Sequence, residues 1–257
     1  MLGLTVAMLG TISFAQARNG ENATPQLEFP SVIFHLEQAQ RTGSPQVSYQ
    51  LIRQYQLSGS NSSEVSSTVV VEVEYLPPDH ETYVIEKRNG SSRGEQVVRR
   101  ILDHESAKVA AGPGSWSAAL LTRDNYTFSD LGESTLDDRS FYVIGLAPKR
   151  KEKELIAGRA WVDKDTFRIR RIEGEMAKSP SWWLKRVSVR LDFSEVSGLW
   201  LQTAMQATAD IRFAGSQTLQ GQILDCRKPE VVATGKTRHG RTIRAGVPAE
   251  LLFPSAR

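Results

Sequence analysis

Two copies of one tripeptide are the first candidates for chemistry in this sequence, because each places carboxylates on both sides of an imidazole. They are Asp79-His80-Glu81 and Asp103-His104-Glu105. If they met across a fold, these groups could bind a metal ion. The histidines lie at positions 35, 80, 104 and 239, and none shows the H-x-x-x-H or H-E-x-x-H spacing of a zinc site. We expect solvated charge at both tripeptides and no metal site.

Two further motifs resemble known signatures but lack an essential residue. Gly235-Lys236-Thr237 resembles the end of a phosphate-binding loop, yet the required glycine five residues before Gly235 is replaced by Glu230, whose carboxylate would repel phosphate. The segment Gly112-Pro113-Gly114-Ser115-Trp116 does not satisfy the G-x-S-x-G pattern of a nucleophile elbow. We therefore expect no catalytic residue, no cofactor and no enzymatic activity.

The N-terminal segment favours export. Residues 2–15 are almost wholly apolar, and Ala15-Gln16-Ala17 follows as an A-x-A cleavage signal. This run is short for a membrane span, so we interpret residues 1–17 as a secretory signal peptide, the alternative being an anchor that stays attached. No cysteine lies near Ala17 to carry a lipid, and the single Cys226 excludes an internal disulfide. The expected product is a soluble periplasmic protein.

The composition indicates a globular chain with a sizeable core. The 257 residues are 40% hydrophobic and 24% charged, which argues against a disordered, collagen-like, coiled-coil or multispan membrane protein. This length fits one large all-β domain or two small domains. The formal net charge of +3 is too small to indicate a nucleic-acid binder.

Three segments follow the predicted signal peptide. Residues 18–30 are polar and contain proline, as in a flexible leader, and residues 31–226 carry the periodic patterns of a folded domain. Residues 227–257 have little periodicity and an excess of Lys and Arg, so we interpret them as a basic C-terminal extension. This extension is either solvated or in contact with anionic lipid headgroups, which would give peripheral membrane contact.

Alternating hydrophobicity dominates the domain and predicts antiparallel strands with one buried face. The predicted strands cover residues 46–58, 66–76, 81–88, 140–148, 154–163, 166–176, 181–193, 199–214 and 218–226. Only residues 31–41 and 95–111 have helical periodicity. A sheet of this size curls, and its apolar concave face needs a cover. The predicted fold class is therefore all-β dominated: a curved antiparallel half-barrel meander covered by short helices.

The inward-facing side chains of these strands form the candidate ligand-binding set. The set is Tyr49, Leu51, Arg53, Tyr55, Val71, Val73, Trp183, Val187 and Val189. Adjacent Trp182 and Trp183 would point to opposite faces of a strand, which leaves one of them exposed or under a cover. This arrangement is compatible with an apolar ligand groove.

The order of these elements resembles the LolA/LolB-like superfamily, and within it the bacterial outer-membrane lipoprotein-sorting-protein-like group. The similarity lies in the diproline segment VEVEYLPPDHETYVIEKRNG at 71–90 and in the hairpin segment GRAWVDKDTFRIRRIEGEM at 158–176. It implies a half-barrel with helices across its mouth. It also implies a role like that of the best-known members, which carry lipoprotein acyl chains through the periplasm, or of a related branch that senses periplasmic stress by binding a regulatory partner.

The resemblance also suggests a role for Arg53, because the carrier of this family has an arginine that holds its lid shut. Arg53 interrupts the apolar inward face of the first strand. The alternative is that Arg53 pairs with an acid at the barrel rim.

Two functions therefore stand. The first is a periplasmic carrier for lipoprotein acyl chains or lipid, with envelope proteins as possible partners. The second is a non-enzymatic interaction or stress-sensing module whose cavity is filled by its own side chains.

Overall fold

A computed structural model describes residues 27–42, 47–59, 65–112, 119–182, 184–212 and 215–228. The predicted signal peptide, most of the leader, nearly all of the basic extension and Trp183 lie outside the described residues.

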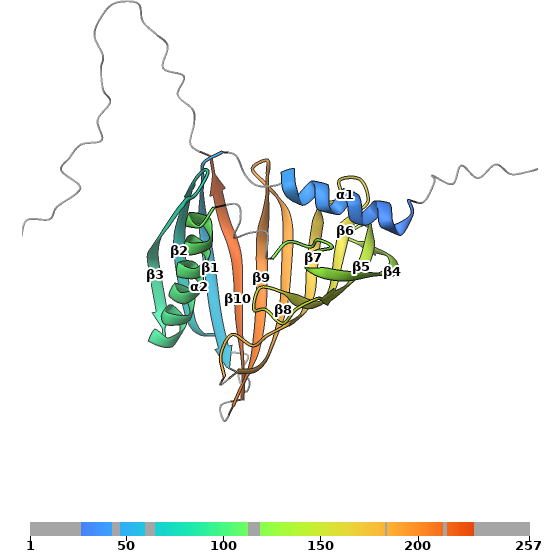
Figure 1. The fold of residues 1–257 in the computed structure, drawn as a ribbon. Helices are drawn as coiled ribbons and strands as arrows, with labels where there is room; N and C mark the ends of the chain where they lie inside the picture. The colour runs from blue at the N-terminus through green and yellow to red at the C-terminus, as the bar shows by residue number, and fades with distance from the viewer. Residues whose placement is uncertain are drawn as a thin grey trace, which may run out of the picture.

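The described residues form a 10-stranded antiparallel sheet and two helices (Figure 1). The helices are α1 (Phe29–Thr42) and α2 (Ser92–Ala110). The strands are β1 (Tyr49–Gly59), β2 (Val65–Leu76), β3 (His80–Gly90), β4 (Tyr126–Leu136), β5 (Arg139–Pro148), β6 (Ile156–Asp163), β7 (Ile169–Met176), β8 (Leu184–Val196), β9 (Leu199–Ile211) and β10 (Gly215–Arg227). The predicted fold class is confirmed: the sheet is curved, antiparallel and open, and helices cover it.

The strand order departs from a single meander. It runs β3-β2-β1-β10-β9-β8-β7-β6-β5-β4, so β1 pairs with the last strand and β3 and β4 form the two edges. The chain leaves one edge through α2 and returns at the opposite edge. Two meanders are therefore joined by the β1–β10 pairing, which brings residues far apart in sequence side by side.

One strand, β4, was not predicted from the sequence. Most of its residues are exposed, and its pairing with β5 shifts register between Asp130 and Glu133. Gly132 lies in this irregularity with a φ of 85°, a value that favours glycine. An exposed, irregular edge strand has no long alternation of apolar residues, which removes the signal on which a prediction depends.

Both helices cover the same face of the sheet. Directly opposed residues of neighbouring strands share a face. The row through Tyr55 continues across the sheet as Gly221, Met205, Leu191, Ile172, Ala160 and Ile144. Tyr55 belongs to the hydrophobic cluster beneath α2, and Ile144 belongs to the cluster beneath α1. We call this side the helix-covered face and the opposite side the open face.

Helix α1 begins at Phe29, two residues before the predicted start. The Glu28 carbonyl accepts the backbone N–H groups of Ser31 and Val32, at 2.9 and 3.2 Å. Pro30 is tolerated in this first turn because a proline there loses no intrahelical hydrogen bond. Three side chains of α1 are buried in the cluster over β4–β7, namely Val32, Ile33 and Leu36.

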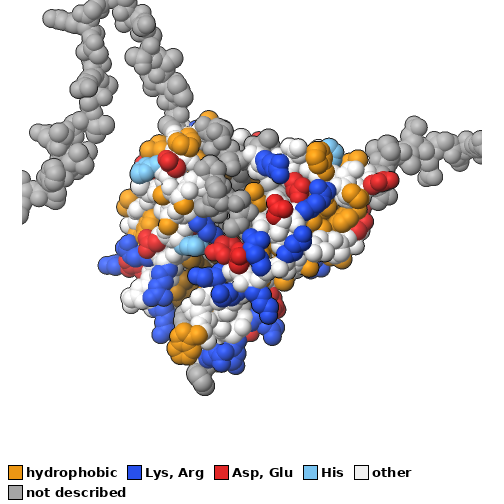
Figure 2. Space-filling model, viewed as in Figure 1, with side chains coloured by type: hydrophobic (Ala, Val, Ile, Leu, Met, Phe, Trp, Pro, Cys, Tyr) orange, Lys and Arg blue, Asp and Glu red, His pale blue; other side chains and the backbone are white. Residues whose placement is uncertain are grey.

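Helix α2 approaches the sheet most closely near its first turn. A Cβ placed on Gly94 would lie 2.2 Å from Ser67 Oγ on β2, so only glycine allows this contact. Further along, Val98, Leu102 and Val109 are buried in the cluster over β1–β3. Figure 2 shows the molecule from the same direction as Figure 1. On this side the surface mixes hydrophobic and charged side chains and has no continuous apolar patch. Within the described ranges, neither helix is long and apolar enough to cross a membrane.

Replacing Leu36 with alanine should test the cover formed by α1. Leu36 is fully buried, so Leu36→Ala should lower the free energy of unfolding by about 2–5 kcal/mol. The matched control is Phe34→Ala on the same helix, where the side chain is 49% exposed. Urea titration measures both values, and equal losses in the two variants would contradict the burial assigned to α1.

Candidate functional site

Arg53 lies in the middle of an apolar row on β1. The row contains Tyr49, Leu51, Tyr55 and Leu57, all of which are buried. The Arg53 side chain is only 18% exposed. A guanidinium that leaves water loses hydration, so it needs a partner close by.

That partner is Glu105 of α2. Arg53 Nη1 donates to Glu105 Oε2 at 2.9 Å, and the Glu105 side chain is 34% exposed. Burial acts to lower the pKa of Arg53, but the Glu105 carboxylate, the Tyr55 hydroxyl and the Glu81 carboxylate outweigh it, and the pKa lies above its ordinary value. Arg53 therefore stays cationic, and the ion pair connects the sheet to the helix that covers it.

A second carboxylate, Glu81, faces the same guanidinium from the start of β3. Ser106 Oγ of α2 lies 3.4 Å from Glu81 Oε1 and donates to it. Burial raises the pKa of Glu81, the Glu105 charge raises it further, and Arg53 and Ser106 act in the opposite direction. Two carboxylates thus share one cation, and they compete for it because only Glu105 has the direct contact.

The two D-H-E tripeptides therefore do meet, through their glutamates and Arg53. Their glutamates face Arg53, and Tyr83 Oη donates to Asp103 Oδ1 at 2.5 Å. His80 and His104 are exposed, as the prediction of solvated charge requires, but that prediction is wrong for Glu81 and Glu105, which are half-buried. Among the described residues, no group of three or more His, Cys, Asp or Glu side chains could hold a metal ion.

Three tyrosines surround this ion pair. Tyr49 and Tyr75 stack with their ring centroids 5.0 Å apart. Burial raises the pKa of both Tyr49 and Tyr55, while the charge of Arg53 opposes the shift. The tyrosines therefore remain neutral at physiological pH.

Three of the remaining predicted site residues lie beside Arg53, and the others do not. Val71 is directly opposite Arg53 on β2, and Leu51 and Val73 form the neighbouring pair; all three are buried in the cluster beneath α2, where they form packed core. Val187 and Val189 lie on β8, which β10 and β9 separate from β1. Val189 is opposed to Ala207, in the row that leads to Leu57, so it lies on the helix-covered face. Trp183 lies outside the described residues.

The space beside Arg53 is small in this closed arrangement. A pocket lined by Arg53, Tyr55 and Met205 has a volume of about 10 Å³, room for about one water molecule. An acyl chain could enter here only if α2 moved.

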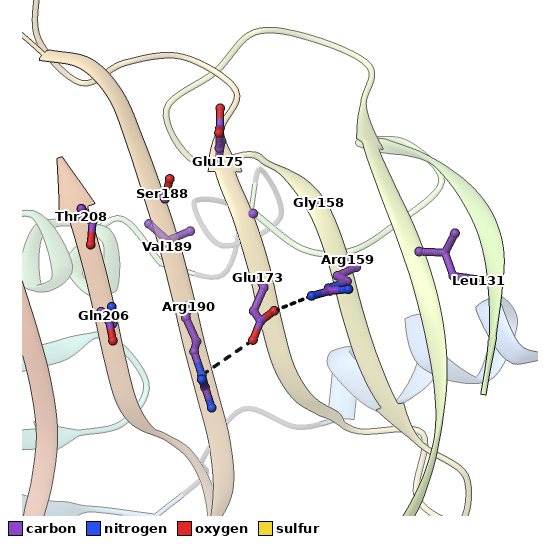
Figure 3. A pocket seen from close by; sticks show the side chains of 11 residues that line it. Leu131, Gly158, Arg159, Glu173, Glu175, Ser188, Val189, Arg190, Gln206 and Thr208 are labelled. Carbon is purple, nitrogen blue, oxygen red and sulfur yellow. Dashed lines mark hydrogen bonds and ion pairs between the residues drawn. The ribbon is translucent and has the colours of Figure 1, made fainter. Parts of the chain in front are cut away.

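A larger hollow lies on the open face (Figure 3). Its volume is about 560 Å³, and Glu173 lies in it between Arg159, at 3.1 Å, and Arg190, at 3.8 Å. Gln206 and Thr208 of β9 also line it. Burying an apolar chain against these charges would desolvate them without replacing their hydration, so this hollow does not suit an acyl ligand.

The sequence contains a signal for Glu105 that the prediction missed. Glu105 lies seven residues after Val98, three after Leu102 and four before Val109, all of which are buried on α2. This spacing puts a carboxylate on the apolar stripe of the helix. A carboxylate on the apolar stripe of a helix and a guanidinium in the apolar row of a strand are expected to pair, because each loses its hydration on burial and the opposite charge offsets that loss.

Comparisons with known proteins give structural similarity alone. No model of a protein family matches the sequence, and no curated protein matches it. A putative outer membrane lipoprotein-sorting protein domain from Vibrio parahaemolyticus is 12% identical, with 79% of this chain and 94% of that chain covered and a TM-score of 0.43. A DUF1329 family protein from Desulfovibrio piger is also 12% identical, with the same coverage and a TM-score of 0.41.

A LolA superfamily protein from Nitrosomonas europaea is 14% identical, with 80% of this chain and 96% of that chain covered and a TM-score of 0.35. The TM-scores are all below 0.5, so the proposals below depend on the geometry of this chain.

Replacing Glu81 with glutamine should reveal the competition for Arg53. The pKa of Glu81 is raised in the folded protein, so between the unfolded and folded pKa values the folded state binds more protons, and the contribution of Glu81 to stability falls as pH rises. Glu81→Gln should therefore increase the free energy of unfolding at about pH 7 and change it little at about pH 4, where the unfolded side chain is also protonated.

Urea titrations at the two pH values measure this difference. Glu74→Gln, at an exposed position of β2, is the control for loss of a surface charge. The same pH-dependent gain in both variants would contradict a special environment at Glu81.

Proposed function

We propose that this protein is an exported carrier for an apolar ligand, most simply the acyl chain of a lipoprotein or another lipid, and that α2 is the cover that opens to admit it. The observation that carries the proposal is the Arg53–Glu105 ion pair. It is a polar contact in the middle of an apolar interface, between the sheet and a helix that has to move.

The ion pair of α2 lies within the apolar contact between this helix and the sheet, which favours α2 as the moving element. Helix α1 is held by both neutral and charged contacts: the Gln40 amide pairs with the Leu121 backbone in both directions at 2.9 Å, and the Glu37 carboxylate accepts the Arg123 backbone N–H at 2.7 Å and pairs with its guanidinium at 3.2 Å. His35 also stacks on Phe167, with ring centroids 4.6 Å apart.

Helix α2 is held to the sheet by its buried apolar side chains and, in addition, by several charged groups. Besides the Arg53–Glu105 pair, Arg88 Nη1 of β3 donates to Glu95 Oε2 at 2.7 Å, and the Tyr83 hydroxyl donates to Asp103. Contacts of this kind exchange for hydration when they separate, so they cost less to open than a dry apolar contact. A change of charge at Arg53 or Glu105 would therefore loosen α2.

The energetics allow reversible uptake. An acyl chain that replaced α2 against the inward faces of β1 and β2 would bury about ten methylene groups at ~0.8 kcal/mol each, or about 8 kcal/mol before association costs. The inward residues Tyr49, Leu51, Tyr55, Val71 and Val73 would then form part of the ligand contact. Export, cleavage after Ala17 and a periplasmic location belong to the same proposal, as does the non-enzymatic role.

A second function is favoured by one observation. The space beside Arg53 is only about 10 Å³. A module with a permanently filled interior would instead act through its surface on envelope proteins. The two proposals differ in whether α2 opens.

Native mass spectrometry should decide between these functions. A carrier purified from an envelope fraction should retain a stoichiometric lipid or acylated peptide, or should take up added fatty acid. An interaction module should show the mass of the chain alone under both conditions, and that result would contradict the carrier.

Glu105→Gln should loosen α2 specifically. Loss of a charge-assisted hydrogen bond should raise amide hydrogen exchange in Ser92–Ala110 by about tenfold and leave α1 unchanged. The matched control is Arg100→Gln, which removes one exposed charge from the same helix. If both variants exchange alike, or if exchange rises equally in α1, the ion pair does not control the cover.

A further inference from the structure

Trp182 is the most exposed of the large hydrophobic side chains in the part of the chain that the structure describes. Its exposed fraction is 82%. It lies in the turn between β7 and β8, beyond the end of the sheet's hydrogen-bonded pairing. A single exposed apolar side chain is common on a protein surface, so the groups around this indole decide what the position can bind.

The turn that carries Trp182 is closed by its own hydrogen bonds. The Ser179 hydroxyl lies 3.0 Å from the Ser181 carbonyl oxygen and 2.9 Å from that of Leu184. The Leu184 N–H donates to the Ser181 carbonyl at 3.1 Å. These bonds join Ser179, Ser181 and Leu184 and do not involve the indole of Trp182, which is exposed.

Basic side chains surround this turn. Lys178, Lys185, Arg186 and Arg212 are all exposed. Leu184 pairs with Ile211, which places Arg212 beside the start of β8.

Two acids also lie here, but both have partners. Glu175 pairs with Arg186 at 3.4 Å, and Asp210 accepts a hydrogen bond from Ser216 at 2.6 Å. Within the described part of the chain, Lys178, Lys185 and Arg212 make no ion pair. Figure 2 shows Lys and Arg side chains gathered toward the lower tip of the molecule. Three unpaired cations thus accompany one exposed indole.

We propose that this Trp182 surface, formed by Trp182, Lys178, Lys185, Arg186 and Arg212, docks on a lipid membrane that contains anionic headgroups. An indole is stable at the boundary between headgroups and acyl chains, where its ring is apolar and its N–H remains solvated. Lysine and arginine beside it attract anionic lipid. This docking does not require the interior to open, so it is independent of the carrier proposal.

A fluorophore at the turn tests the contact locally. The full-length chain with Ser181→Cys carries an environment-sensitive dye, and the matched control is Val84→Cys on the edge strand β3, where the native side chain is 61% exposed. Cys226 is buried, so it should label slowly. Vesicles of about one-third phosphatidylglycerol in phosphatidylcholine should shift the emission of the dye at 181 to the blue and leave the dye at 84 unchanged.

Variants then test the named residues. Trp182→Ala should weaken the partition of the protein onto vesicles by at least about fivefold. The double variant Lys185→Gln, Arg212→Gln should weaken this partition by about fivefold for each cation that is removed. Leu131→Ala, at another exposed apolar position, should not change it.

Three results would overturn the proposal. The first is a dye at 181 that stays in water while the protein binds vesicles, because another segment then makes the contact. The second is no binding at all. The third is a response to soluble polyglutamate but not to vesicles, which would assign the surface to an acidic polypeptide.

Discussion

A sheet that is apolar on one face has to cover that face, and this requirement shapes the molecule. Ten strands present a single apolar side, and the chain supplies two helices for it. Because the strands are joined in an open order with edges at β3 and β4, the sheet cannot cover itself by closing. The helices therefore cover the apolar face. The contacts that hold each helix decide which part of that face can be uncovered.

The Arg53–Glu105 pair makes the cover over β1–β3 different from the cover over β4–β7. An ion pair within an apolar interface gives little net stability, because desolvation offsets much of the attraction, yet losing one partner is costly. The ion pair therefore favours one position of α2. It stabilises that position less than additional apolar packing between the helix and the sheet would. Glu81 adds a competing carboxylate at the same guanidinium, which ties the position of α2 to the charge around Arg53.

The two faces of the sheet have separate chemistry. On the helix-covered face, the space beside Arg53 and Tyr55 is about the size of one water molecule. The open face carries the larger hollow, with Glu173 between two arginines. An apolar ligand that bound beside Arg53 would therefore have to displace α2. The Trp182 turn lies beyond the end of the β7–β8 pairing, so a membrane could contact it without disturbing either face.

The sequence by itself determined the strands with alternating burial, both helices to within a few residues, and the inward position of Arg53, because a period of two or 3.6 is a local property of the chain. It did not determine β4, whose exposed, irregular pattern carries no such signal. Nor did it determine the β1–β10 pairing or the partner of Arg53. These are contacts between distant segments, and only the tertiary structure brings Glu105 of α2 within 2.9 Å of Arg53. The size of the interior space was decided in the same way, since it depends on how side chains from many elements pack together.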